Sequence, residues 1–174
     1  MGIMIKETDA RFSHFTPEMD AAYLRMAIKA GEDAKKAGNH PFGAIMVDID
    51  GKVLIEQGNV EVTERDCTGH AETTLLRKAT KKYEKDFLWN CTLYSSFEPC
   101  CMCSGAAYWA NIGRIVFAAS EAALLEKTGD NELNPTFAAD CRGILERGQK
   151  DMVIRGPVKW LEDEALAAHE GYWD

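Results

Sequence analysis

The sequence has no apolar run of about 18 residues, the length at which a membrane-spanning helix is expected. Its first residues also lack the basic, apolar and small-residue succession of a secretory signal. No internal repeat, low-complexity tract or flexible linker is evident in the 174 residues. We therefore expect a cytoplasmic protein without a membrane partner, folded as a single domain over residues 1–174.

Basic residues are also scarce. The chain has 20 lysines and arginines against 28 aspartates and glutamates, and its net charge is −8. Proteins that bind nucleic acids need lysine and arginine gathered on one face, where they contact phosphates. The composition therefore argues against a tRNA or DNA substrate and favours a small molecule.

Three of the six cysteines crowd together at Cys100, Cys101 and Cys103. In a reducing compartment, cysteines at such spacing bind metal more often than they form disulfides. We expect Cys101 to pack between two metal ligands without coordinating the ion. The other cysteines, which we expect to be ordinary buried residues, are Cys67, Cys91 and Cys141.

Apolar periodicity and turn residues predict alternating helices and strands. Thr16 is a typical helix N-cap with Pro17 at the first helical position, and Asp50-Gly51 between apolar runs predicts a hairpin. The predicted elements are an arm at 1–15, a helix at 16–38, strands at 42–49 and 52–56, a helix at 71–82, a strand at 91–95, a helix at 100–110, a strand at 114–118, helices at 121–127 and near 137–147, a strand at 152–155, and a C-terminal segment at 160–174 with a helix to 169. This order indicates an α/β layer architecture.

The most informative motif is His70-Ala71-Glu72, followed 30 residues later by Pro99-Cys100-Cys101-Met102-Cys103. His70, Cys100 and Cys103 are residue types that bind zinc, and Glu72 is not needed as a fourth ligand. Structural zinc sites are usually closed by four protein ligands, whereas catalytic sites keep one position open. The pattern therefore predicts one catalytic Zn²⁺ per chain. A structural zinc or plain core thiols would be the alternative for the cysteines alone.

From about Pro41 to Ala119 the sequence resembles the cytidine and deoxycytidylate deaminase superfamily, whose signature is His-x-Glu followed by Pro-Cys-x-x-Cys. Its branch with bacterial guanine deaminases, fungal cytosine deaminase and tRNA adenosine deaminases is the most similar, and Tyr108-Trp109-Ala110 looks most like guanine deaminase. The other matching segments are Pro41-Phe42-Gly43-Ala44, Gly58-Asn59 and Glu98 to Ala107. The resemblance implies a three-layer α/β/α sandwich with a five-stranded mixed sheet, as in cytidine deaminase, and a homodimer.

The resemblance also implies a mechanism. Zinc held by His70, Cys100 and Cys103 lowers the pKa of a bound water toward about 7. Glu72 then acts as general base and general acid, moving protons to a ring nitrogen and to the departing amino group. A catalytically idle partner subunit is the non-enzymatic alternative, but it would have little reason to retain Glu72.

Several residues match substrate-binding positions of the family. Asn59 matches an asparagine that hydrogen-bonds the base, although it could also be a turn residue after Gly58. Phe42 and Trp109 match positions at or near the base pocket, where rings can stack, and core packing is equally open for Trp109. We also expect Ala71, between His70 and Glu72, to be a substrate-binding residue. Trp173 either closes the pocket of its own or a neighbouring subunit as a lid, or packs into its own core.

The substrate is the least determined part of the prediction. A guanine site benefits from a carboxylate that accepts hydrogen bonds from N1–H and the exocyclic amine. The position that matches the guanine-binding aspartate is Asn131, so Asp130 or Glu132 would have to replace it, unless these residues form a solvated loop. The prediction is hydrolysis of guanine to xanthine and ammonia. The alternatives are deamination of cytosine, of a nucleoside, pterin or triazine, or, less favoured, of tRNA adenosine.

Overall fold

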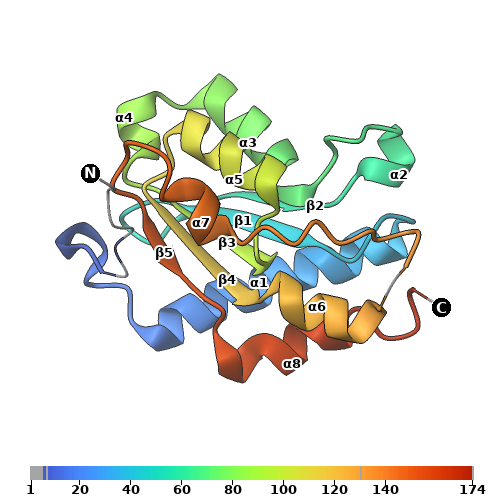
Figure 1. Cartoon of the computed structure of the whole chain (residues 1–174). Coiled ribbons are helices and arrows are strands. Elements are labelled where there is room, and N and C mark those ends of the chain that lie inside the picture. Colours follow the sequence, from blue (N-terminus) through green and yellow to red (C-terminus); the bar gives the residue numbers. More distant parts are fainter. Residues whose placement is uncertain (1–5, 7, 130, 174) are drawn as a thin grey trace.

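The computed structural model of the chain describes residues 6, 8–129 and 131–173. The strands are β1 (Gly43–Val47), β2 (Val53–Gly58), β3 (Thr92–Phe97), β4 (Arg114–Ala119) and β5 (Val153–Arg155). They form one sheet in the order β2-β1-β3-β4-β5 (Figure 1). β1 is antiparallel to β2 and β3, whereas β3, β4 and β5 run parallel. The predicted five-stranded mixed sheet is confirmed.

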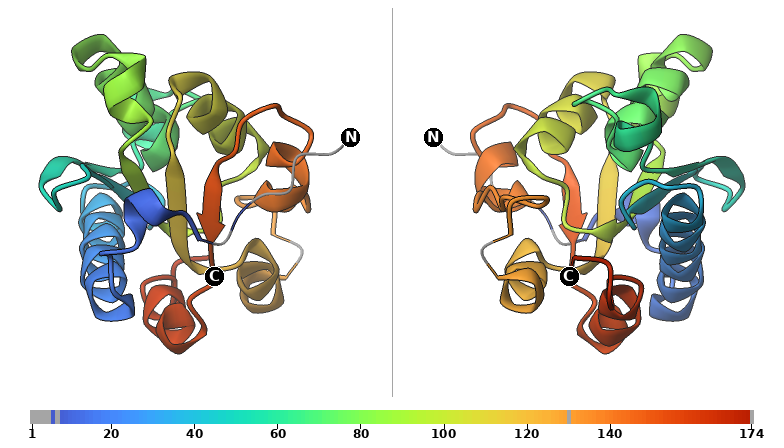
Figure 2. Two further views of the ribbon diagram at one scale, coloured as in Figure 1. Left: turned by 90° about the vertical axis from the view of Figure 1, so that its left-hand side faces the viewer. Right: turned by 90° about the vertical axis from the view of Figure 1, so that its right-hand side faces the viewer.

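The helices are η1 (Ala10–Phe12), α1 (Pro17–Lys36), α2 (Glu61–Glu64), α3 (Ala71–Lys82), α4 (Lys85–Leu88), α5 (Cys101–Ala110), α6 (Glu121–Thr128), α7 (Cys141–Leu145) and α8 (Lys159–Ala167). They cover both faces of the sheet (Figure 2). Side chains of α3, α5 and α7 share one core cluster, and those of α1, α6 and α8 share the other. Within the described residues, no helix is long and apolar enough to cross a bilayer.

β1 shows how the sheet supports two cores. Ala44 and Met46 point into the cluster beneath α3, whereas Ile45 and Val47 point into the cluster beneath α1. Successive side chains of a strand point to opposite faces, so a strand covered by helices on both sides must be apolar throughout. All four of these side chains are fully buried.

The structure differs from the predicted elements in three places. Residues 8–15 do not form a loose arm, because Phe12 and Phe15 are buried in the core on the α1 side. The helix expected near 137–147 is only α7, since the Asp140 side chain accepts a hydrogen bond from the Gly143 N–H and so caps the helix there. The short helices α2 and α4 were not predicted.

The strand register gathers several chain segments at one end of the sheet. Gly43 pairs with Gly58, Ala44 pairs with Ser95, and the parallel pair β3 and β4 ends together at Phe97 and Ala119. The segments that follow β2, β3 and β4, and the one that precedes β1, therefore meet at this end. In open α/β sheets, ligands bind in the crevice outside the carboxyl ends of the strands, and this is the end at which β3 and β4 finish.

Close packing of α1 on β1 depends on Gly43. A Cβ atom at this position would lie 2.1 Å from the Ala27 carbonyl oxygen and 2.4 Å from the Gly31 nitrogen. Only glycine allows this approach. The contact also helps to position Phe42, which directly precedes β1 at the end of the sheet where these segments meet.

A buried ion pair joins α1 to the central strands. Arg114 donates to both carboxylate oxygens of Asp20 at 2.9 and 2.6 Å, and the Tyr94 hydroxyl donates to Asp20 at 2.6 Å. The Arg114 and Asp20 side chains are 1% and 4% exposed. Removal of one partner would leave an uncompensated buried charge, and this is far more destabilising than the loss of an exposed pair.

We expect Asp20→Ala to lower the free energy of unfolding by about 3–5 kcal/mol, because Arg114 would remain buried without its counter-ion. Asp33→Ala is the matched control on the same helix, since Asp33 forms only exposed pairs with Lys29 and Lys36 and should cost less than about 1 kcal/mol. Urea unfolding measures both. Equal losses in the two variants would contradict this account of Asp20.

Candidate active site

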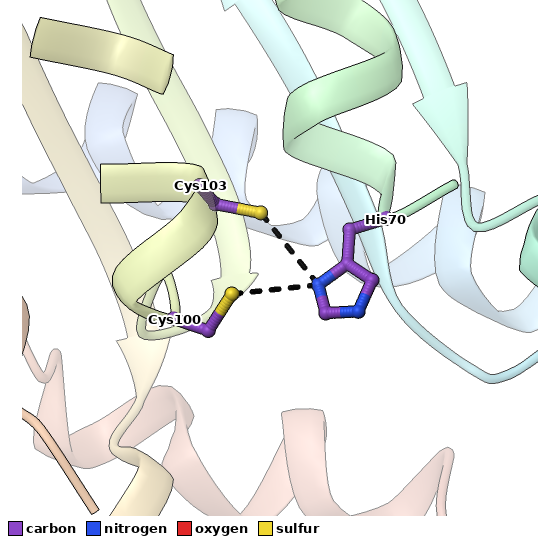
Figure 3. Close-up of side chains that lie close together, drawn as sticks. All are labelled: His70, Cys100 and Cys103. Atoms are coloured by element: carbon purple, nitrogen blue, oxygen red, sulfur yellow. Dashed lines mark hydrogen bonds between the residues drawn. The ribbon is translucent and has the colours of Figure 1, made fainter. Parts of the chain in front are cut away.

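His70, Cys100 and Cys103 converge at the end of the sheet (Figure 3). The His70 Nδ1 atom lies 3.5 Å from the Cys100 sulfur and 3.6 Å from the Cys103 sulfur. The three ligand atoms all lie within 4.8 Å of one another. One imidazole nitrogen and two sulfurs at this spacing match the donor types and number of a catalytic zinc site. Cys101 is not part of this group, as the sequence predicted.

Two helix starts provide these ligands. His70 is the N-cap residue of α3 and Cys100 is the N-cap residue of α5, while Cys103 lies one turn further along α5. The two helices share the same core cluster, so their starts lie side by side. Unpaired backbone N–H groups at a helix start favour negative charge, which stabilises thiolates.

The electrostatics of the group also favour an anion at one of the two sulfurs, that of Cys100. Hydrogen bonds from the Cys103 thiol and from His70 lower the pKa of Cys100 to about 4. The hydrogen bond with the Cys100 sulfur in turn raises the pKa of His70 to about 9. The second thiol, Cys103, has a raised pKa because it donates to Cys100 and is buried. A divalent cation would therefore find one sulfur already ionised.

Glu72 is buried beside the ligands, with its Oε2 atom 3.6 Å from the Cys103 sulfur. Its Oε1 atom accepts a hydrogen bond of 2.8 Å from the Ser95 hydroxyl, and its side chain lines the cavity described below. Burial raises the pKa of Glu72 above its usual range. A carboxyl whose pKa lies closer to neutrality both accepts and releases protons readily, as a general acid and base must.

Glu61 contacts the outer side of the metal ligand His70. Its Oε2 atom lies 3.7 Å from His70 Nε2 and 3.9 Å from His40 Nε2. At 3.7 Å the Glu61 carboxylate lies beyond hydrogen-bond length, but its negative charge favours a proton on His70 Nε2, which leaves Nδ1 free to bind metal. Sequence reasoning missed Glu61, because nothing in its local pattern separates it from an exposed first-turn glutamate.

The ligands open into a cavity of about 270 Å³. Its aromatic side chains are Phe42, Phe97 and Phe137, and Phe42 and Phe97 meet edge to face with ring centroids 5.6 Å apart. Leu133 and Pro135 form another part of the wall. Aromatic and aliphatic walls of this kind, beside polar side chains, suit an aromatic heterocycle.

Asn59 lies in the cavity wall and is 2% exposed. Its Oδ1 atom accepts a hydrogen bond of 3.0 Å from the Glu61 N–H, so both the turn and the ligand interpretation of this residue have support. This bond also fixes the orientation of the amide. In the described part of the chain the Asn59 NH₂ group has no partner, and it remains free to donate to a ligand carbonyl.

Three other residues from the sequence prediction, all in the described part of the chain, do not line this cavity. Trp109 is 74% exposed on the outer side of α5, so it neither packs in the core nor reaches the cavity. The Ala71 methyl group is buried in the core between α3 and the sheet. Glu132 is exposed, and Asp130 lies outside the described residues. A further correction concerns Cys67, which is exposed because it lies in the loop between α2 and α3.

Trp173 packs into its own chain, beneath the cavity wall. Its ring stacks on His40 at 5.3 Å and donates from Nε1 to His169 Nδ1 at 3.0 Å. It also lies against Phe42, with ring centroids 6.2 Å apart. Trp173 therefore supports two residues of the wall without lining it, which is the core-packing alternative of the sequence prediction.

Two further glutamates line the cavity and were not singled out from the sequence. Glu98 accepts backbone hydrogen bonds from Cys141 at 2.9 Å and from Glu121 at 3.3 Å, and so joins the starts of α7 and α6. Glu121 is the first residue of α6. An acidic residue in the first turn usually only complements the helix dipole, so its sequence position gave no signal of a place in the cavity.

Comparison with known proteins gives consistent matches. The family model described as the cytidine and deoxycytidylate deaminase zinc-binding region matches residues 17–119. The chain is 41% identical over 160 residues to a probable cytosine deaminase of Schizosaccharomyces pombe, a match that covers 90% of this chain and 94% of that protein. It is 42% identical over 98 residues to guanine deaminase of Bacillus subtilis, covering 56% and 62% of the two chains.

Among solved structures, guanine deaminase from Nitrosomonas europaea superimposes with a TM-score of 0.71 at 27% identity, over 90% of this chain and 84% of that one. The chain belongs to the cytidine and deoxycytidylate deaminase family. It is accordingly a zinc-dependent deaminase, and the donor set formed by His70, Cys100 and Cys103 fits the ion.

We expect Glu61→Gln to weaken zinc binding by about 10- to 100-fold, because an amide orients the His70 ring less strongly than a carboxylate. Glu64→Gln is the matched control, since Glu64 lies on the same short helix and is exposed. Competition with a chromogenic chelator measures the affinity of each purified variant. Wild-type affinity in Glu61→Gln would rule out this role for Glu61.

Proposed function

We propose that the protein removes the exocyclic amino group of a free nucleobase by hydrolysis, and that guanine, converted with water to xanthine and ammonia, is its leading substrate. One arrangement carries the proposal. The buried Glu72 lies beside the three potential metal ligands, and Glu72, His70 and Cys100 line an aromatic cavity large enough for a nucleobase. Similarity to guanine deaminases in sequence and structure supports the purine assignment.

The charges in the cavity favour a neutral base over a nucleotide or a nucleic acid. The glutamates among the lining residues are Glu61, Glu72, Glu98 and Glu121, and within the described chain the lining includes no lysine or arginine. A phosphate group would be repelled here, because phosphate binding requires cationic side chains or free backbone N–H groups. This argues against nucleotides and tRNA as substrates.

Each group of the site has a role in this reaction. When bound, zinc supplies a nucleophile from water at neutral pH. Glu72 takes up and returns protons, to a ring nitrogen and then to the leaving amino group, while Ser95 holds its other oxygen in place. The Asn59 NH₂ group donates to a carbonyl of the base, and Phe42 and Phe97 exclude water from the ring faces.

Cytosine is the second candidate. The relative that matches nearly the whole chain is a probable cytosine deaminase. Cytosine also carries a carbonyl for Asn59 and an amino group on a ring carbon next to a nitrogen. The argument for cytosine is that this one relative is similar over nearly the whole chain. The argument for guanine is that both sequences and solved structures of guanine deaminases are similar to the chain.

Ammonia release from guanine and from cytosine, measured side by side with zinc-loaded protein, tests the substrate assignment. We expect turnover of guanine to exceed that of cytosine. Turnover of cytosine alone would move the protein to the pyrimidine branch. Absence of turnover with both bases would reject the free-base assignment for these two substrates and direct the search to nucleosides, pterins and triazines.

We expect Glu72→Ala to retain stoichiometric zinc and to lose at least about 10²- to 10⁴-fold in kcat, because the metal ligands remain while proton transfer is removed. Metal analysis and ammonia release on the same preparation measure both quantities. If the variant instead lost its zinc, Glu72 would be a metal ligand and the proposed proton-transfer role would be wrong.

A further inference from the structure

Glu121 is a cavity carboxyl without a hydrogen-bond partner in the described part of the chain. The Ser120 hydroxyl accepts from the Ala123 N–H and fixes the start of α6, which places Glu121 at the first helical position. The Glu121 N–H donates to Glu98, so the backbone of this residue is held on the sheet end. Its side chain nevertheless lines the cavity without a hydrogen bond or ion pair to any other described residue.

The neighbouring glutamates are already committed. Glu98 uses one oxygen for the Cys141 N–H and the other for the Glu121 N–H. Glu61 lies against His40 and His70, and Glu72 accepts from Ser95. Glu121 is therefore the one carboxyl among the described lining residues that makes neither a hydrogen bond nor an ion pair with another residue.

Among the described residues, no lysine or arginine lines the cavity or the adjoining hollow at Glu121. Burial raises the pKa of Glu121 to about 7, and the nearby negative charges of Cys100, Glu72 and Glu98 add to the effect, with a smaller opposing contribution from His70. Asp140 and the apolar side chains of Ala122 and Leu125 lie beside it in an adjoining hollow. A half-buried carboxyl in this position is stabilised by neutral N–H donors of a bound molecule.

We propose that Glu121 is a specificity-determining residue that accepts a hydrogen bond from an N–H group of the base, opposite in character to Asn59, which donates to a carbonyl. This inference rests on the proposed function. It implies a substrate that presents both a carbonyl oxygen and a ring N–H, as free oxopurines and cytosine do. A nucleoside, in which a sugar replaces the hydrogen of one ring nitrogen, would lose the contact if that nitrogen is the donor.

The inference also explains how this chain could recognise a base without an acid at Asn131. Asn131, after α6, stands at the position that matches the guanine-binding aspartate of the resembling enzymes. Its amide donates to the Trp173 carbonyl at 2.7 Å and so holds the C-terminal segment in place. Glu121, at the opposite end of α6, faces the cavity instead.

Steady-state kinetics of Glu121→Gln test the proposal, with whichever of guanine and cytosine the wild type deaminates. The change is nearly isosteric, but it removes the charge and places an NH₂ group where an acceptor stood. In assays at a pH above the pKa of Glu121, where its carboxyl is ionised, we expect KM to rise by about 10- to 100-fold, as for loss of a hydrogen bond to a charged group, with kcat changed by less than about threefold. Glu126→Gln, an exposed position on the same helix, should leave both constants unchanged.

N-methylated bases provide a readout that a merely structural role would not move. Methylation of the ring nitrogen that donates to Glu121 should raise KM in the wild type and have little further effect in Glu121→Gln, because the contact is already absent. Comparison of 1-, 7- and 9-methylguanine, or of 1-methylcytosine, identifies that nitrogen. Equilibrium dialysis repeats the test without turnover. It measures binding of the same bases to Glu72→Gln and to the double variant Glu72→Gln/Glu121→Gln.

The outcomes separate this inference from the proposed function. A wild type that releases ammonia from neither base overturns both. An active wild type with an unchanged KM in Glu121→Gln, or with methylation effects equal in wild type and variant, overturns the role of Glu121 alone. Loss of kcat at constant KM would also overturn it, because Glu121 would then act in proton transfer and not in recognition.

Discussion

The site depends on two helix starts lying side by side at one end of the sheet. α3 begins after His70 and α5 begins after Cys100, and both helices pack on the same sheet face through a shared apolar core. Three metal-binding atoms thereby come within 4.8 Å of one another. The same helix starts supply the positive ends of two helix dipoles, which favour the thiolates that the metal requires. A shift of either helix along the sheet would separate the ligands.

Around this group, the four cavity glutamates differ in what holds them, although all belong to one residue type. Glu98 accepts two backbone hydrogen bonds and joins loop segments, whereas Glu61 faces the outer nitrogen of His70. Glu72 is buried and held by Ser95, and Glu121 lines the cavity without a hydrogen-bond partner among the residues that the structure describes. Burial of carboxylates is costly unless they are paired, so their accumulation here is more easily explained by ligand chemistry than by stability.

The C-terminal segment takes part in the cavity indirectly. Trp173 is buried against His40 and His169, and the loop after α6 is fastened to it through Asn131. His169 is itself buried, and burial lowers its pKa to about 3, so it remains neutral and accepts from the indole N–H. His40 and Phe42 of the cavity wall thus pack against Trp173. This packing explains the tryptophan at position 173 without a contact between its side chain and a ligand.

Local sequence patterns predicted the parts of the fold that local physics controls. Thr16 with Pro17 marked the start of α1, and apolar β-branched runs marked the strands, because capping and side-chain period act over a few residues. The pattern failed at residues 137–140, where Phe137 to Ala139 have helical composition but Asp140 caps the next helix. An apolar residue such as Phe137 can equally line a cavity, and composition does not separate the two cases.

By itself, then, the sequence determined the chemistry: an imidazole, two thiols and a carboxyl at the spacing of a zinc-dependent deaminase, which are covalent facts of the chain. Only the tertiary structure decided which further side chains share the cavity. Glu61 and Glu121 line it, whereas Trp109 and Glu132 are exposed and do not line it. The reason is that strand register and helix packing join segments distant in sequence, and the direction of each side chain depends on those long-range contacts.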